Sequence, residues 1–121
     1  MWKYIISSGA IVSPDGAASH VGYSGQPECR NDPAQCSAHN RGPIPPGRYT
    51  IEPPRDTDAH GPFVLPLTPD PENEMYGRSG FLIHGDSVAH PGTASEGCII
   101  QPRAVREKVW ASGDRELEVV E

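Results

Sequence analysis

The sequence has no long apolar run and no basic cluster. None of its apolar stretches approaches the ~20 residues that a membrane-spanning helix needs, so we expect no membrane insertion. The formal net charge at pH 7 is −6, and the acidic residues are scattered along the 121-residue chain. Proteins that bind nucleic acid through charge carry a basic patch or stripe. We therefore do not expect nucleic acid as a partner.

The start of the chain does not resemble a signal peptide. Residues 2–12 contain one positive charge and two short apolar pieces, which Ser7, Ser8 and Gly9 separate. A secretory signal has an unbroken apolar region of about 7–15 residues. We expect folded strands in this segment. If the protein works outside the cytoplasm, we expect a route other than a conventional signal to deliver it.

Hydrophobic residues are few, and turn-forming residues are many. The hydrophobic content is 36%, whereas glycine (13) and proline (14) together fill 27 positions. This composition favours short strands joined by many turns over a helical bundle. The length allows one hydrophobic core but not two. We expect a single, mainly β domain over residues 1–121, a small sandwich or barrel with one or two short helices.

Apolar patterns and turn signals predict the elements of this domain. We predict strands at residues 2–6, 10–12, 48–51, 63–67, 81–83 and 117–120. Pro66 lies inside the fourth of these, which is therefore expected at a sheet edge or a bulge. Pro102 begins one short helix, in which Val105 and Val109 share a face and which Gly113 ends. Residues 17–41 are polar and show no periodicity, so we expect a long loop there.

The chain has only three cysteines, which divide into a pair and a single residue. Cys29 and Cys36 lie seven positions apart in a polar loop, whereas Cys98 stands alone. We interpret the pair as a disulfide that closes the loop, and two free thiols with no special role are the alternative. A zinc site fits less well, because structural zinc takes closely spaced ligand pairs.

Residues 81–100 hold most of the side chains that can do chemistry. The apolar residues 81–83 predict a buried strand that ends at His84, and a turn of small residues presents Cys98. A free cysteine thiol has a pKa of about 8.5 and is a nucleophile only as the thiolate, so it needs a base. His84 is the candidate base, and Cys98 is the candidate nucleophile.

Several motifs together resemble a known family. They are Tyr4-x-x-Ser7-x-Gly9 and residues 22–25 (GYSG), 42–49 (GPIPPGRY), 77–86 (GRSGFLIHGD) and 95–99 (SEGCI). The order His-Gly, then Ser-x-Gly-Cys, is similar to the catalytic domain of bacterial L,D-transpeptidases. The whole set resembles the L,D-transpeptidase-related effectors of type VI secretion systems. The sequence departs from the wider pattern at Glu96, where a histidine is usual, and at Ile100, where an arginine is common.

The resemblance implies a β-sandwich-like catalytic fold and a defined reaction. A cysteine thiolate attacks the carbonyl of meso-diaminopimelate, the third residue of a peptidoglycan tetrapeptide stem, and D-alanine leaves. Water then completes an L,D-carboxypeptidase reaction, or a D-amino acid completes an exchange. No cofactor is implied. The implied partners are peptidoglycan stems, the type VI secretion machinery and a cognate immunity protein, and the implied place of action is the periplasm of a target cell.

Four residues near the base and the nucleophile are candidates for supporting roles. Backbone N–H groups of the turn at Gly97 are the expected oxyanion donors, and Gly85 lies next to the base. Ser95 either supports the turn by a hydrogen bond or only caps it. Asp86 either orients His84 or bonds its own backbone, and a backbone carbonyl could equally orient the ring.

Two arginines are candidates for binding the substrate carboxylate. A guanidinium can hold a carboxylate with two hydrogen bonds, which favours Arg103 and Arg78, although an exposed arginine is often only solvated. Two other functions stay open. One is a zinc hydrolase that uses His84, His90 and Cys98, which do not share a rigid face, so we expect no metal site. The other is a peptidoglycan-binding module without catalysis.

Overall fold

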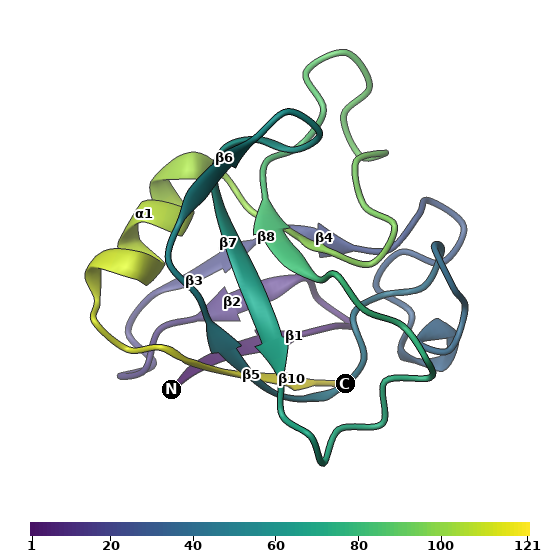
Figure 1. Ribbon diagram of the computed structural model, residues 1–121, viewed down its shortest axis with the longest axis horizontal. Coiled ribbons are helices and arrows are strands. Elements are labelled where there is room, and N and C mark those ends of the chain that lie inside the picture. Colours follow the sequence, from purple (N-terminus) through teal and green to yellow (C-terminus); the bar gives the residue numbers. More distant parts are fainter.

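The computed structural model describes residues 1–121 as a mainly β domain with a single α-helix (Figure 1). The strands are β1 (Trp2–Ile5), β2 (Ala10–Val12), β3 (Ser19–Val21), β4 (Tyr23–Ser24), β5 (Gly47–Ile51), β6 (Arg55–Thr57), β7 (Gly61–Pro69), β8 (Leu82–His84), β9 (Ile99–Ile100) and β10 (Glu116–Val120). The helices are the 3-10 helix η1 (Pro33–Gln35) and α1 (Arg103–Ala111). No helix is long and apolar enough to cross a membrane.

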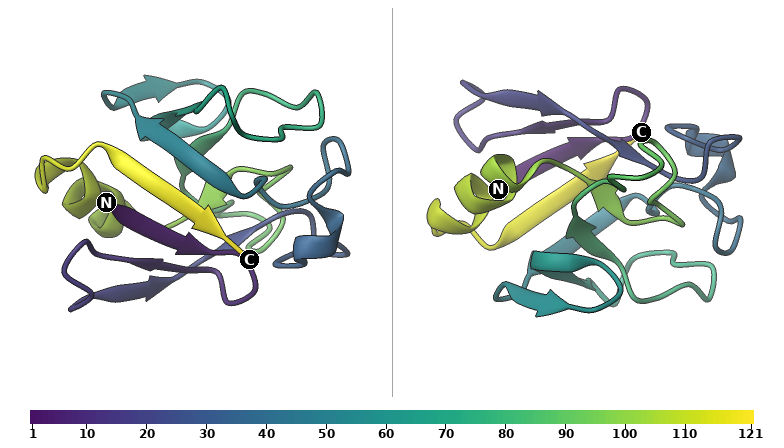
Figure 2. Two further views of the ribbon diagram at one scale, coloured as in Figure 1. Left: turned by 90° about the horizontal axis from the view of Figure 1, so that it is seen from below. Right: turned by 90° about the horizontal axis from the view of Figure 1, so that it is seen from above.

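The strands form one sheet that almost closes on itself. Their order is β3-β2-β1-β10-β5-β7-β8-β9-β4, and β6 pairs with β7 beside this path. The two ends of the order, β3 and β4, are consecutive in the chain and are separated by Gly22 alone. The Gly22 N–H donates to the Gly9 carbonyl at 2.7 Å, and a Cβ atom on Gly22 would lie 1.8 Å from the Ile100 carbonyl oxygen. The resulting barrel-like sheet, seen along two further directions in Figure 2, confirms the predicted fold class.

The core fills the inside of this sheet with side chains from alternate strand positions. Trp2 and Tyr4 of β1 are buried, and the residue between them is exposed, as a period of two requires. Val105 and Val109 of α1 lie four positions apart on one helix face and are buried against the same cluster of 17 core residues. The helix packs on β7 and β8, so the strand that carries His84 is backed by the core.

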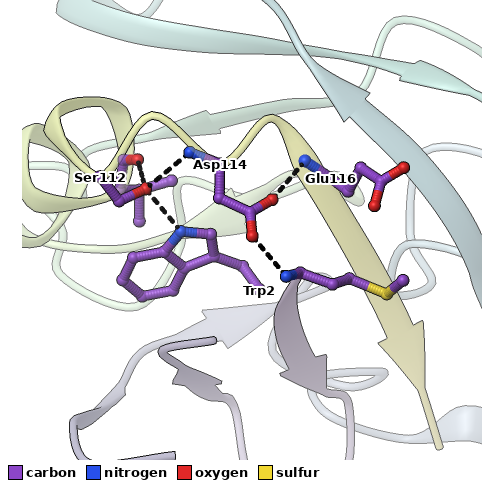
Figure 3. Close-up of polar contacts among 6 residues, drawn as sticks. Trp2, Ser112, Asp114 and Glu116 are labelled. Carbon is purple, nitrogen blue, oxygen red and sulfur yellow. Dashed lines mark hydrogen bonds and ion pairs between the residues drawn. The ribbon is translucent and has the colours of Figure 1, made fainter. Parts of the chain in front are cut away.

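A polar network ties the first strand to the turn between α1 and β10 (Figure 3). The Trp2 indole N–H donates to Ser112 Oγ at 3.0 Å, and the amino group of Met1 pairs with the Asp114 carboxylate. The same carboxylate accepts the Glu116 N–H at 3.0 Å. These bonds support the parallel pairing of β1 with β10, in which Trp2 lies opposite Leu117.

The sequence missed four of the strands, which are β3, β4, β6 and the two-residue β9. The predicted loop at 17–41 contains β3, β4 and η1, and residues 55–62, for which no strand was predicted, hold β6 and the start of β7, which form a hairpin. β3 and β6 are exposed along most of their length, and their polar residues carry no alternating apolar pattern. Their backbones pair because a neighbouring strand offers unsatisfied N–H and C=O groups, a tertiary cause that a local pattern does not reveal.

Pro66 was predicted to lie at a sheet edge or a bulge, and the edge position is wrong. β7 is an interior strand, and Pro66 sits where its partners change from β8 to β5. The Pro66 carbonyl accepts the Glu52 N–H at 2.8 Å, and the next N–H, of Leu67, donates to the Phe81 carbonyl at 3.0 Å. The hydrogen bonds of β7 to its neighbours therefore do not require an N–H group at residue 66, and proline is accepted there.

The predicted disulfide is also absent, since Cys29 and Cys36 are buried free thiols. The two sulfur atoms face different surroundings. Cys29 Sγ lies 3.9 Å from Gln35 Oε1, whereas Cys36 belongs to the main core cluster and its Sγ lies 3.7 Å from the Ile44 carbonyl oxygen. Core packing, and no covalent bond, holds this loop in place. Burial raises the pKa of the Cys36 thiol to about 11, which keeps it protonated and unreactive.

Candidate active site

Two neighbouring parallel strands bring the candidate base and nucleophile together. β8 ends at His84, and β9 begins directly after Cys98. His84 lies opposite Ile100 in the parallel register, which places Cys98, two positions earlier, beside Leu82. Because side chains alternate along a strand, His84 and Cys98 point to the same side of these two strands.

Both side chains open into one cleft with a volume of ≈ 800 Å³. Its walls come from the turn between β6 and β7 (residues 59–62), the segment before β8 (residues 79–81), the loop after β8 and one side chain of α1. In Figure 1 the β6–β7 turn and the loop after β8 rise from the same side of the sheet. The cleft is thus a place where a peptide can reach both residues.

Hydrogen bonding sets the proton on one nitrogen of His84. The ring is 2% exposed, and Nδ1 lies 2.8 Å from the carbonyl oxygen of Gly85. A carbonyl only accepts, so Nδ1 carries the proton and Nε2 keeps its lone pair. Nε2 has no hydrogen-bond partner. Burial lowers the pKa of His84 more than the bond to Gly85 raises it, so the ring is neutral at pH 7 and able to accept a proton.

A second histidine, His60, which the sequence did not mark as a site residue, stacks on His84. The His60 ring comes from the β6–β7 turn and lies with its centroid 4.4 Å from that of His84, with 36° between the planes. His60 also lines the cleft. Its charge adds to the lowering of the His84 pKa. No local signal marks His60, because a hairpin that the sequence did not predict brings it to the site.

The Cys98 thiol is protonated at neutral pH. Burial raises its pKa to about 11, and the Leu82 N–H and Arg78 only partly oppose this, while the Glu96 carboxylate adds to it. Cys98 Sγ lies 3.9 Å from the Gly80 carbonyl oxygen, which is a weak contact. The site therefore holds a neutral thiol and a neutral imidazole rather than a preformed ion pair.

Ser95 organises the turn before the nucleophile. Its hydroxyl donates to the Cys98 carbonyl at 2.6 Å and accepts the N–H groups of Gly25 at 2.9 Å and Gly97 at 3.1 Å. The expectation that Gly97 supplies an oxyanion donor is therefore wrong, because its N–H is already engaged. Gly97 has φ = 142°, and a Cβ atom there would lie 2.4 Å from Arg78 Nη2, so close approach explains the glycine.

Arg78 lies beneath this turn and does not line the cleft. Its side chain is 8% exposed, and its two terminal nitrogens donate to the carbonyls of Cys36, Gly42, Pro43 and Glu96 at 2.6 to 3.1 Å. These bonds use the planar guanidinium to join the loop before β5 to the turn that carries Cys98. The predicted role in binding a substrate carboxylate is corrected accordingly.

Asp86 anchors the loop after β8 and does not orient His84. One carboxylate oxygen accepts the Tyr23 hydroxyl at 2.6 Å and the Ser87 N–H at 2.8 Å, and both oxygens accept the Gly92 N–H at 3.1 Å. Burial acts to raise the Asp86 pKa, but these hydrogen bonds outweigh it and the pKa is lowered. The orienting group for the imidazole is the Gly85 carbonyl instead, an alternative that the sequence left open.

Arg106 of α1, and not the predicted Arg103, lines the cleft. Arg103 is not part of the cleft wall: it pairs with Glu107 at 3.4 Å and lies over the Phe63 ring at 5.5 Å. Arg106, three positions further on, is 5% exposed and does line the cleft. The predicted role of Arg103 at the cleft is thus wrong. The helical spacing on the buried face of Val105 and Val109 could have pointed to Arg106.

The zinc ligand set considered from the sequence does not form. His90 lies in the exposed part of the loop after β8, and its N–H donates to Ser87 Oγ at 2.9 Å. No group of three histidine, cysteine, aspartate or glutamate side chains converges anywhere in the structure as metal ligands would.

Comparison with known families places this site in context. A family model described as the Tlde1 domain matches residues 19–120, which include every wall of the cleft. The chain belongs to the Tlde1 domain family. Tlde1 domains are type VI secretion effector domains, so the secretion machinery is a partner and the domain is delivered into target cells. No curated protein and no solved structure gave a significant match.

Proposed function

We propose that this Tlde1 domain is a cysteine-dependent enzyme that acts on peptidoglycan tetrapeptide stems. It cleaves the bond between meso-diaminopimelate and the terminal D-alanine, or exchanges that D-alanine for another D-amino acid. The observation that carries the proposal is the pairing, in one cleft, of the Cys98 thiol with a buried His84 whose Nε2 is a free acceptor. Membership of an effector family supports a toxic activity against another cell.

In the first step, the stem binds with the diaminopimelate carbonyl over Cys98. The thiol turns from the Gly80 carbonyl toward His84, and Nε2 takes its proton as the sulfur attacks the carbonyl carbon. Because the thiol pKa is raised to about 11 and the imidazole pKa is lowered, proton transfer and attack are coupled. The Gly85 carbonyl stabilises the imidazolium that forms, by holding Nδ1–H.

In the second step, the carbon–nitrogen bond breaks and D-alanine leaves. The imidazolium returns its proton to the leaving amine, and the acyl group remains on sulfur as a thioester. With Gly97 engaged by Ser95, the Cys98 N–H is the donor of the turn that we assign to the developing oxyanion. Water then attacks the thioester and gives a tripeptide, or the amine of a D-amino acid attacks and gives an exchanged tetrapeptide.

The proposed place of action is the periplasm of the target cell, where peptidoglycan stems are exposed. Removal or exchange of the terminal D-alanine deprives the wall of normal donors for crosslinking. A producing cell that holds the same substrate needs protection, so a cognate immunity protein is the further partner that we propose.

Mass spectrometry of intact muropeptides tests the function directly. Purified tetrapeptide muropeptides are incubated with the wild-type domain, with Cys98→Ala and with His84→Ala, each with and without an added D-amino acid. The wild type is expected to release D-alanine and, with the amino acid present, to form the exchanged stem. Both variants are expected to be inactive while keeping the circular dichroism spectrum of the wild type. Full activity of Cys98→Ala would refute the mechanism, binding without any mass change would indicate a non-catalytic module, and loss of activity with chelator alone would indicate a metal hydrolase.

A further inference from the structure

Arg106 is a buried cation without an acidic partner. Its side chain is 5% exposed, and its Nε has no hydrogen-bond partner. Nη1 makes one long contact, at 3.5 Å, to the Phe63 carbonyl. The nearest acid on the helix, Glu107, pairs with Arg103 and is 55% exposed. A buried charge is costly unless a counter-ion and hydrogen bonds compensate it. The protein itself supplies no anion for this arginine.

The guanidinium lies next to the catalytic base. A Cβ atom placed on Gly85 would lie 3.2 Å from Arg106 Nη2 and 3.5 Å from Nη1, so the group packs against the peptide whose carbonyl holds the His84 ring. The same guanidinium lines the cleft into which His84 and Cys98 open. An anion bound to this guanidinium would therefore lie beside His84.

The carboxylates of the cleft do not serve as this anion. Asp86 is occupied by the Tyr23 hydroxyl and by the N–H groups of Ser87 and Gly92. Glu96 is exposed and acts on the Cys98 thiol. The missing anion must therefore come from a ligand, and a planar guanidinium fits a carboxylate with two parallel hydrogen bonds.

We propose that Arg106 binds the terminal α-carboxylate of the stem, an inference that rests on the function proposed above. The leaving amine of the terminal residue must reach His84, and its carboxylate is only one carbon atom further along. A carboxylate-binding group beside the base is thus in the right place. The proposal makes the domain an exopeptidase, which acts on stems with a free terminal carboxylate and leaves stems whose D-alanine is amide-linked to a neighbour. In the exchange reaction, the incoming D-amino acid must likewise carry a free carboxylate.

Two substrates and three proteins test this assignment. The substrates are a tetrapeptide stem with a free terminal carboxylate and the same stem with a terminal carboxamide. The proteins are wild type, Arg106→Gln and, as a matched control on the same helix, Arg103→Gln. We expect the wild type to prefer the acid by about 10- to 150-fold in kcat/KM, the range of a hydrogen bond to a charged group. In Arg106→Gln, kcat/KM should fall by that factor on the stem with the free carboxylate and change little on the stem with the carboxamide. Arg103→Gln should match the wild type on both substrates.

Equal losses by Arg106→Gln on both substrates would overturn the proposal, since a purely structural role would not distinguish them. Arg106→Lys, which keeps the charge, should retain part of the preference, and thermal melting identifies any variant that fails to fold. Binding of both stems to Cys98→Ala, measured by calorimetry, gives the same comparison without turnover. If the wild type releases no D-alanine yet Cys98→Ala binds the acid better than the amide, the proposed reaction fails and the carboxylate site stands. If the wild type is active on both substrates equally, the carboxylate site fails and the reaction stands.

Discussion

The His60 ring stacks on the His84 ring, with 4.4 Å between the centroids, although His60 lies in the turn between β6 and β7 and His84 ends β8. This contact joins the turn between β6 and β7 to the base of the proposed reaction. Through this contact, His60 in the β6–β7 turn acts to lower the pKa of His84 at the end of β8.

Replacing His60 with phenylalanine should shift the pH profile of the proposed reaction. The aromatic ring still covers His84, but the charge that lowers the His84 pKa is gone, so this pKa rises. The base must be neutral to act, and the acidic limb of the kcat/KM profile should therefore move to higher pH, with kcat at the plateau little changed. His39→Gln, in an exposed position beside Tyr76, is the control. An unchanged acidic limb in His60→Phe would show that the stacking has no electrostatic effect on the base.

Neutralising Glu96 should make the nucleophile more reactive. The carboxylate contributes to the raised pKa of Cys98, so Glu96→Gln lowers this pKa and increases the thiolate fraction at a given pH. In a protein that also carries Cys29→Ser and Cys36→Ser, only Cys98 can be alkylated. We expect Glu96→Gln to increase the rate of this alkylation by iodoacetamide at pH 7 to 9 by about two- to tenfold. Glu107→Gln is the surface control. Slower alkylation of Glu96→Gln than of the wild type would contradict the assignment.

Arg78 should be required for stability rather than for substrate binding. Arg78→Met leaves three buried carbonyl acceptors and one partly buried acceptor without a donor. At about 1–3 kcal/mol for each buried acceptor, the free energy of unfolding should fall by at least about 3 kcal/mol. Urea denaturation measures the loss. Arg41→Met removes an exposed pair with Glu28 and should cost less than about 1 kcal/mol. If both variants lose the same small amount, the buried hydrogen bonds of Arg78 do not stabilise the fold as we argue.

All three cysteines should be alkylated after denaturation without reductant. The structure has Cys29 and Cys36 as free, buried thiols, so intact mass should increase by three alkyl groups in denaturant and by fewer in the native protein. Prior treatment with reductant serves as the reference and should give the same count. A count of one that rises to three only after reduction would restore the disulfide.

The sequence predicted the parts of the fold and site that depend on local chemistry. The apolar run at 81–83 led to a strand ending in a histidine, and the valines at 105 and 109 located the buried face of the helix. Both depend on periodicity, which a single sequence displays. The structure also places His84 and Cys98, the candidate base and nucleophile, in one cleft, and their catalytic roles stay a prediction.

The remaining residues could not be assigned because their roles come from tertiary contacts. Arg78 and Arg106 are both buried arginines in the structure, yet one is surrounded by carbonyls and the other faces the cleft. Nothing in their neighbours along the chain separates these two cases. His60 likewise reaches the site on a hairpin whose first strand, β6, is too polar and too short to be predicted.

The pairing of β1 with β10 has a consequence for how the domain forms. The strands at the two ends of the chain lie side by side in the interior of the sheet order, with Trp2 opposite Leu117. Contacts between such distant residues are slow to form, because a long loop must close first. Catalytic competence should therefore arise late, when the final strand docks. Truncation before residue 116 should abolish the barrel as a whole instead of fraying one edge, and a toxin that enters its target unfolded would become active only after complete entry.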